Sequence, residues 1–183
     1  MDAIEMIKER RSVRKYKQKK VDRETMKEII DIARWAPSWA NYQIARYTLV
    51  DSDETIKKLA TDGVKGFVYN IKTLENAQGV AVLSFVKGKS GKLDVNKDEY
   101  ATSKAHVWEV FDAGIACQTF CLAAHAKGVG TCIFGVIDEA SISQIVGLPE
   151  NETVAALIVY GYEDGPHPAP TPRKNVDAIV RFV

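Results

Sequence analysis

The chain has 183 residues, a length that fits one domain with a sizeable hydrophobic core. A formal net charge of +1 argues against general binding to nucleic acid or to a membrane surface, because both need a basic excess. Hydrophobic residues make up 46% of the chain, which is typical of a globular protein and not of a disordered one. We therefore expect a single domain over residues 1–183 that binds neither nucleic acid nor a membrane.

The cysteines and the N-terminus predict a cytoplasmic location. The three cysteines form neither a CxxC pair nor an even set for disulfides. Cys117 and Cys121 are one helical turn apart in an apolar run, so we expect buried thiols, as in a reducing compartment. The N-terminus has no apolar signal core, and no apolar run reaches the span of a bilayer.

The first part of the chain predicts two helices. Asp2 and Glu5 have the spacing of a capping box for a short helix that ends near Arg10. Asp22 is the expected N-cap of a second helix, whose apolar residues recur at helical spacing until Pro37 stops it.

A basic segment, Arg10-Arg11-Ser12-Val13-Arg14, separates the two helices. If the segment is extended, its side chains alternate, and Arg10, Ser12 and Arg14 share one face. Arg11 and Val13 then take the other face. Two guanidinium groups beside a hydroxyl form a donor-rich surface that suits a phosphate or an anionic ring edge. On these five residues alone, a solvated basic turn is the favoured alternative.

A loop of unusual composition follows the second helix at residues 36–43. Ser38 and Asn41 belong to types that usually bond to their own backbone in turns. Trp39 and Tyr42 are less expected there, since exposed aromatic side chains tend to mark a contact surface.

The remaining chain predicts an α+β sandwich, in which helices cover both faces of one central sheet. The strand at 79–86 is nearly all apolar and should be buried on both faces. A charged loop at 87–98 is the most mobile segment expected, and alternating prolines make the tail after residue 161 extended. Strands are predicted at 46–50, 79–86, 131–134 and 153–160, and helices at about 54–60 (capped by Asp53), 69–76, 103–127 and 139–146 (capped by Asp138).

Residues 113–124 are apolar on nearly every side of the longest helix. Such a helix must be covered all round, either by the sheet and two helices or by a second subunit. We favour a contribution from a homodimer.

Four motifs together carry a family resemblance: residues 10–14, residues 36–43, Gly128-Val129-Gly130-Thr131 after an apolar helix, and Pro172-Arg173-Lys174 after the proline-rich tail. In this order and spacing they resemble the FMN-dependent nitroreductase family over essentially the whole chain. The resemblance implies a central mixed, mainly antiparallel sheet flanked by helices. It also implies an intertwined homodimer that binds two FMN molecules between its subunits.

The resemblance further implies roles for particular residues. Arg10, Ser12 and Arg14 would bind the phosphate, ribityl chain and pyrimidine edge of the flavin, and Ser38 and Asn41 would reach the flavin of the partner subunit. Arg173 would complete the phosphate site. Phe134 stands where some relatives carry an acid near flavin N5, so that backbone groups would supply any hydrogen bond there. The full expected cofactor-binding set is Arg10, Arg11, Ser12, Arg14, Pro37, Ser38, Asn41, Asn70, Phe134, Gly135 and Arg173.

The residues agree in kind with this cofactor. Arginine forks suit a doubly charged phosphate, and a positive charge near N1, for which Arg14 is the candidate, would stabilise the anionic reduced flavin. No GxGxxG follows the first strand, so a Rossmann dinucleotide site is not indicated. The loop departs from the family at Ile44-Ala45, where Pro-Trp or Pro-Phe is usual, and this alters the stiffness of the loop.

The implied reaction is ping-pong. NADH or NADPH gives a hydride to FMN, which reduces a nitroaromatic, a quinone or a related small acceptor. We expect no catalytic side chain, because water can deliver protons at an open site, and no metal, because the three histidines are scattered without ligand spacing. The main alternative is a dimeric FMN-binding, flavin-sequestering or redox-sensing module without steady turnover. A weaker one is a specialised reaction such as dehalogenation.

Overall fold

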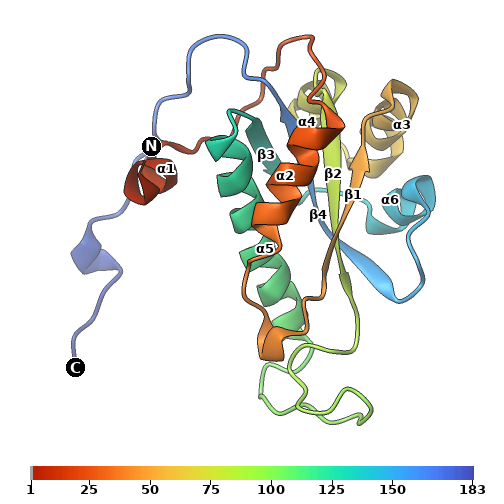
Figure 1. Cartoon of the computed structure of the whole chain (residues 1–183), viewed down its shortest axis with the longest axis vertical. Coiled ribbons are helices and arrows are strands. Elements are labelled where there is room, and N and C mark those ends of the chain that lie inside the picture. The colour runs from red at the N-terminus through yellow and green to blue at the C-terminus, as the bar shows by residue number, and fades with distance from the viewer. Residues whose placement is uncertain (1) are drawn as a thin grey trace.

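The computed structural model describes residues 2–183, and one four-stranded sheet forms its centre (Figure 1). The strand order is β1-β2-β4-β3, with every pairing antiparallel. The parallel component of the expected mixed sheet is one bridge between Ser12 and Thr131. The strands are β1 (Ala45–Val50), β2 (Gly79–Val86), β3 (Gly130–Phe134) and β4 (Glu152–Gly161).

Helices cover both faces of the sheet, as predicted. In Figure 1, α2 and α5 lie side by side on one face, and α3 and α6 lie on the other side. Every residue of β2 is buried, with Ala81 and Leu83 in the cluster beneath α2 and α5, and Val80 and Val82 in the opposite cluster. The helices are α1 (Ala3–Glu9), α2 (Arg23–Ala33), α3 (Asp53–Lys58), α4 (Val68–Glu75), α5 (Val107–Ala126) and α6 (Glu139–Val146), with short turns at η1 (Trp39–Asn41), η2 (Leu59–Gly63) and η3 (Val176–Ala178).

The predicted helix signals are confirmed at three N-termini. The side chain of Asp2 accepts from backbone N–H groups of the first turn of α1, and Glu5 completes the capping box. Asp22 caps α2, and Asp138 caps α6. Gly147 ends α6 in the left-handed conformation, with φ of 66°, which glycine adopts without steric cost.

Two helix boundaries were predicted wrongly. The cap of α3 is Ser52 rather than Asp53, and the α-helix stops at Lys58 because the chain continues as the π-helical turn η2. The long helix begins at Val107 and not at residue 103, since the preceding residues form turns in which Ala105 has φ of 48°.

The first part of the charged loop that we expected to be mobile is anchored on α5. Ser90 and Lys92 are buried, and the Ser90 hydroxyl donates to a carboxylate oxygen of Asp112 at 2.6 Å. Glu109 accepts from the backbone N–H groups of Gly88 and Lys89. Two buried carboxylates of α5 therefore fix the course of this loop.

The chain itself covers only one side of the second half of α5, because Gly114 and Gln118 are exposed and Ile115 and Leu122 are half-buried. Residues such as Phe120 and Cys121 are fully buried between the sheet and α2. By length and composition α5 could cross a membrane, but half of its apolar window is buried inside the protein, as in a core helix. The most exposed apolar side chains of α5 lie in its first half, where Val107, Val110 and Phe111 are more than half exposed.

Candidate functional site

The basic segment lies along the free edge of β3. Ser12 pairs with Thr131, and the Val13 N–H donates to the Thr131 carbonyl at 2.9 Å. Val13 is 3% exposed, and its side chain rests on Gly130, where an added Cβ would stand 2.7 Å from Val13 Cγ2. Gly130 is therefore what allows the segment to lie flat against the sheet.

Tyr16 fastens the end of the same segment. It bridges to Glu163 after β4, and its ring packs on Gly161, where a Cβ would lie 2.9 Å from Tyr16 Cδ1. The hydroxyl donates to the Val13 carbonyl at 2.6 Å. Burial raises the pKa of Tyr16, so the phenol keeps its proton and this hydrogen bond.

The predicted alternation of side chains holds for only part of the segment. Val13 points into the core and Arg14 is exposed, with its Nη1 donating to the Ser12 carbonyl at 3.2 Å. Arg10 and Arg11, however, line one cavity, although strict alternation places them on opposite faces. The reason is that Arg10 still forms the C-cap of α1, so the extended conformation starts after it.

This basic cavity has a volume of about 230 Å³ and lies between the end of α1, the end of α5 and the start of the tail. Its lining brings together the basic side chains Arg10, Arg11, His125 and His167. The Nε atoms of Arg10 and Arg11 are buried and find no hydrogen-bond partner within residues 2–183. Buried donors without an acceptor are rare in native proteins, so these two guanidinium groups fit a ligand with acceptor oxygens at the basic segment.

The far end of β3 carries further predicted residues. The side chain of Phe134 is 1% exposed and packs in the core, which leaves only its backbone for a ligand. Gly135 is exposed, and a Cβ added there would meet no atom within 4 Å. Because the Ser12–Thr131 bridge is parallel, the segment runs from Arg10 towards this end of β3.

Asn70 lies on α4 and is half-buried. The segment before α4 is tied to the loop after β3, since the Asp138 N–H donates to the Gly63 carbonyl at 2.8 Å and Lys65 Nζ lies 2.9 Å from Asp138 Oδ2. The cap hydrogen bond from Ser141 and this ion pair lower the pKa of Asp138 to about 2. Asp138 therefore ties residues 63–65, which precede α4, to the loop that follows Gly135.

The loop with Pro37, Ser38 and Asn41 lies at the opposite edge of the sheet, before β1. Its backbone is strained, because Ala40, Asn41 and Gln43 all have φ between 45° and 54°, a range that favours glycine. Strain of this kind persists where surrounding contacts enforce it, and it clusters at functional sites.

Two contacts hold the strained loop. The Trp39 N–H donates to both carboxylate oxygens of Asp112, at 3.1 and 3.0 Å. The Ser38 hydroxyl oxygen accepts from the Gln43 N–H at 2.9 Å. Asp112, buried on α5, therefore anchors both this loop and the charged loop through Ser90.

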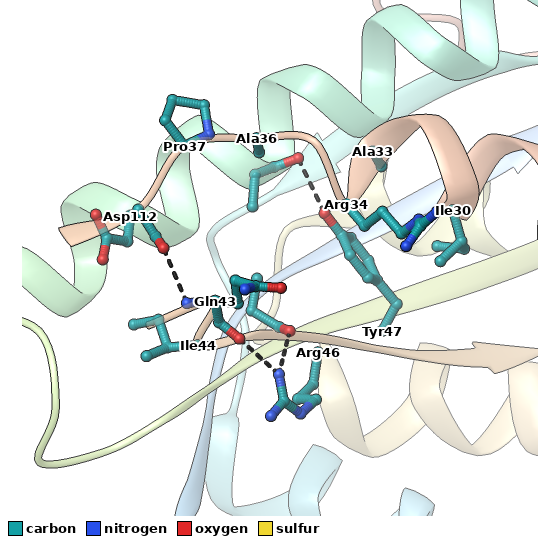
Figure 2. Close-up of a pocket in the computed structure, with 13 residues that line it drawn as sticks. Ile30, Ala33, Arg34, Ala36, Pro37, Gln43, Ile44, Arg46, Tyr47 and Asp112 are labelled. Carbon is teal, nitrogen blue, oxygen red and sulfur yellow. Dashed lines mark hydrogen bonds between the residues drawn. The ribbon is translucent and has the colours of Figure 1, made fainter. Parts of the chain in front are cut away.

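A second cavity, of about 290 Å³, lies beneath this loop (Figure 2). Pro37 and Ser38 line it together with residues of α2, β1 and α5. The Tyr47 hydroxyl donates to the Ala116 carbonyl at 3.1 Å, and Arg46 Nη1 donates to the carbonyls of Gln43 and Ala45 at 2.8 Å. The cavity is mostly apolar, with the guanidinium groups of Arg34 and Arg46 at its border.

One chain does not bring all the predicted residues together. β1 and β3 are the two edges of the sheet, three strand spacings or about 14 Å apart, and the basic segment lies one further position outside β3. In the described part of the chain, Arg173 donates only to Thr171 and Pro172 of its own tail. On one chain, Ser38 and Asn41 therefore do not join the residues at the basic segment.

Two groups of residues could not be predicted from the sequence. His125, Glu163 and His167 meet at the basic cavity, because His167 Nε2 lies 2.8 Å from the carbonyl oxygen of Glu9, 158 residues away. Asp112 looked like one polar residue on an apolar helix, and its anchoring role depends on loops that are distant in the chain. Only the folded arrangement reveals these contacts.

Comparison with known proteins identifies the family. The model of the Nitroreductase family matches residues 7–162. The 4-nitrobenzoate reductase of Nocardioides sp. is 27% identical, with 100% of this chain and 89% of that protein covered. The NADPH-flavin oxidoreductase of Vibrio harveyi is 26% identical, with coverage of 98% and 72%. The solved structure of an FMN-dependent nitroreductase from Clostridium difficile R20291 has a TM-score of 0.77 at 26% identity and covers 98% of both chains. The chain belongs to the nitroreductase family.

Proposed function

We propose that this protein is an FMN-dependent oxidoreductase, which takes reducing equivalents from NADH or NADPH and passes them to a nitroaromatic, a quinone or a related small acceptor. Membership of the nitroreductase family supports an oxidoreductase. The names of the two relatives and of the solved structure, which include nitrobenzoate reduction, NADPH and FMN, support the cofactors and the type of acceptor.

The residues at the edge of β3 fit FMN. The buried, unpaired Nε atoms of Arg10 and Arg11 suit the oxygens of a phosphate dianion. Arg14 is exposed farther along the same edge, towards the end where Gly135 leaves open space for a flat ring. Along the edge of β3, the charged groups that suit the phosphate therefore come first, and the open position that suits the flavin ring comes after them.

In this proposal the protein binds and orients, and no side chain transfers a proton. FMN, when bound, supplies the electron-carrying chemistry between the nicotinamide and the acceptor. Arg14 would hold the pyrimidine edge and stabilise negative charge there, and Asn70 would contact the same edge. Phe67 and Tyr69 are exposed, lie 5.7 Å apart between ring centroids and precede Asn70 closely in the chain, so they would border the space for the acceptor.

We further propose a homodimer in which each FMN is bound by both chains. The observation that carries this proposal is the separation of the expected site, with Arg10–Arg14 at one sheet edge and Ser38 and Asn41 at the other. The apolar surface supports it, because α1 buries none of its residues and Ile4 and Ile7 are about 60% exposed. Three free, buried thiols agree with a cytoplasmic location.

The purified protein tests this function directly. We expect a yellow dimer whose flavin absorbance near 450 nm, on the order of one FMN per chain, is bleached anaerobically by NADH or NADPH. Recovery of the yellow colour on addition of a quinone or a nitroaromatic would complete the cycle. A yellow protein that neither nicotinamide bleaches would instead support the flavin-binding module without turnover.

A further inference from the structure

The side chain of His167 joins the tail that follows β4 to the end of α1 through both of its ring nitrogens. Nδ1 lies 2.8 Å from the carboxylate oxygen Oε2 of Glu163, and Nε2 lies 2.8 Å from the backbone carbonyl oxygen of Glu9. An ionised carboxylate and a carbonyl group can only accept hydrogen bonds, whereas a neutral imidazole has a single N–H group to donate. The geometry therefore fits the imidazolium form of His167, which donates to both oxygens.

The contact with Glu9 uses a carbonyl group that α1 cannot pair by itself. Glu9 is the last residue of α1, and the carbonyl groups of the last helical turn have no partner within a helix. The carbonyl end of a helix also favours a positive charge. Because α1 buries none of its residues, a hydrogen bond from the tail contributes to holding this helix in place.

His167 is the last residue of the tail that a hydrogen bond joins to the rest of the chain. Within residues 2–183, no hydrogen bond or ion pair connects residues 168–183 to any earlier part. Figure 1 shows the tail passing α1 and then running away from the sheet to the C-terminus. Pro166 and Pro168 restrict the backbone on both sides of His167. The contact of this one side chain therefore sets the direction in which the tail departs.

The charged groups around the ring favour a proton on His167. The hydrogen bonds to Glu163 and to the Glu9 carbonyl raise the pKa of His167, and the negative charge of Glu163 adds to this effect. Partial loss of hydration and the positive charge of Arg11 act in the opposite direction, but they are outweighed. The carboxylate of Glu9 lies 3.7 Å from Arg11 Nη2, so it is shared with that guanidinium group.

His125, in the last turn of α5, is the second titratable ring at this place. The two rings are inclined by 24°, with 6.3 Å between their centroids. Burial, and then the charges of His167 and Arg10, lower the pKa of His125; Arg11 acts in the same direction, and Glu9 opposes them. The pKa values of the two rings are thus shifted apart, and His167 is the ring that holds the proton near neutral pH.

We propose that His167 is a pH-sensitive clasp, which joins the tail to the end of α1 while its ring is protonated and releases the tail from α1 when the ring becomes neutral. The neutral ring keeps its one proton on Nδ1, because the hydrogen bond to the carboxylate of Glu163 is the charge-assisted one. Nε2 then presents a lone pair to the Glu9 carbonyl oxygen, and this contact is lost. The proposal does not depend on flavin binding.

The direction of the pH effect follows from the raised pKa of His167. A histidine whose pKa is higher in the folded than in the unfolded protein stabilises the fold fully below the unfolded value, about 6.5. This stabilisation is lost as the pH rises through the folded value. The clasp is therefore closed in mildly acidic solution and opens on the alkaline side of the ordinary histidine range.

Ring ¹⁵N nuclear magnetic resonance of the purified protein between about pH 5 and pH 9 tests the protonation. The chain has three histidines, so His167→Gln and His125→Gln assign the signals. We expect both ring nitrogens of His167 to carry protons at about pH 6.5, and the ring to titrate above that value. Glu163→Gln, which removes the negative charge and keeps an acceptor oxygen, should shift this titration to lower pH. A His167 ring that carries a single N–H at about pH 6 would overturn the proposal.

A nitroxide label on the tail tests the release. Ala169→Cys places a thiol on an exposed residue two positions after His167, and the three native cysteines are buried, so labelling is selective. Electron paramagnetic resonance should show a more mobile label at about pH 9 than at about pH 6. In His167→Gln the mobility should no longer change with pH, because glutamine does not titrate.

His106→Gln is the matched control, since His106 lies at the other end of α5 from His125, and it should keep the pH-dependent change of the label. The melting temperature of each variant shows that it is folded. Should His167→Gln not fold, His125→Gln and His106→Gln still assign the third ring, and the label in the otherwise unchanged chain still reports the release. A label with the same mobility at both pH values in that chain would overturn the clasp.

Discussion

The side chain of Val13 lies so close to Gly130 that a methyl group on residue 130 would stand 2.7 Å from Val13 Cγ2. This contact sets how closely the basic segment approaches β3, and therefore where Arg10 and Arg14 lie. We predict that Gly130→Ala pushes the segment away from the sheet and lowers the free energy of unfolding by about 1–3 kcal/mol. Denaturant titration measures the loss, and FMN retention should fall with it.

A compensating change checks the cause. Val13→Ala removes the atoms that the new methyl group would meet, so the double variant should lose less stability than the sum of the single variants. Strictly additive losses would mean that the contact between residues 13 and 130 does not position the segment.

Two arginines are expected to act on different parts of FMN. Arg173→Ala should weaken the binding of FMN but not of riboflavin, because Arg173 is assigned to the phosphate. Arg14→Ala should weaken both, since it is assigned to the ring edge. Fluorescence titration of the flavin-free protein gives the four dissociation constants. Arg23→Ala serves as the control, because Arg23 pairs with Asp51 on the surface, at 2.7 Å. Equal affinity of the wild type for FMN and riboflavin would contradict the phosphate assignment.

The exposed apolar stripe on α5 predicts a dimer contact. Phe111 is 55% exposed, and Val107 and Val110 lie beside it on the same helix. Phe111→Glu should convert the dimer to a monomer, because a buried, unpaired charge is costly at an interface. Sedimentation measures the mass. Ile32→Glu is the control, since Ile32 is an exposed apolar residue on another helix, α2. A dimer that persists in Phe111→Glu would place the interface elsewhere.

Local signals in the sequence were enough for most of the fold. Asp2 with Glu5, Asp22, and Gly147 mark helix ends through contacts that span a few residues, so the sequence pattern reveals them. The start of α5 was predicted wrongly, because the turn before it contains Ala105 with a φ of 48°. Alanine as a residue type does not predict this left-handed conformation.

The candidate site was predictable only in part. The motif at residues 10–14 pointed to an anion through its composition alone. The pairing of this segment with β3 depends on a contact between residues more than 40 positions apart, and so does the contact of His125 with His167. The periodicity of the sequence therefore cannot predict either contact. The basic cavity can consequently be recognised only in the folded structure.

The depressed pKa of Asp138 predicts a pH dependence of stability. Its ordinary pKa is 3.8, and in the folded protein it is about 2. A carboxyl group with a lowered folded-state pKa stabilises the protein above the unfolded value and loses this effect as the pH falls towards the folded value. The stability difference between wild type and Asp138→Asn should therefore shrink between about pH 4 and pH 2.

Denaturant titrations across this range measure the effect. Asp177→Asn, in the exposed tail, is the control and should show no such change. A difference between wild type and Asp138→Asn that stays constant down to pH 2 would contradict the role of the carboxylate in joining Lys65 to α6.

Complementation between two defective variants tests most directly whether two chains build each flavin site. Arg14→Ala damages the half at β3, and Ser38→Ala with Asn41→Ala damages the half before β1. Each homodimer should retain little FMN. After the two variants are unfolded, mixed equally and refolded, half of the dimers are mixed, and each mixed dimer contains one intact site and one doubly damaged site. We predict recovery of about a quarter of the wild-type FMN content. No recovery in mixed dimers that are shown to form would mean that each chain builds its flavin site alone.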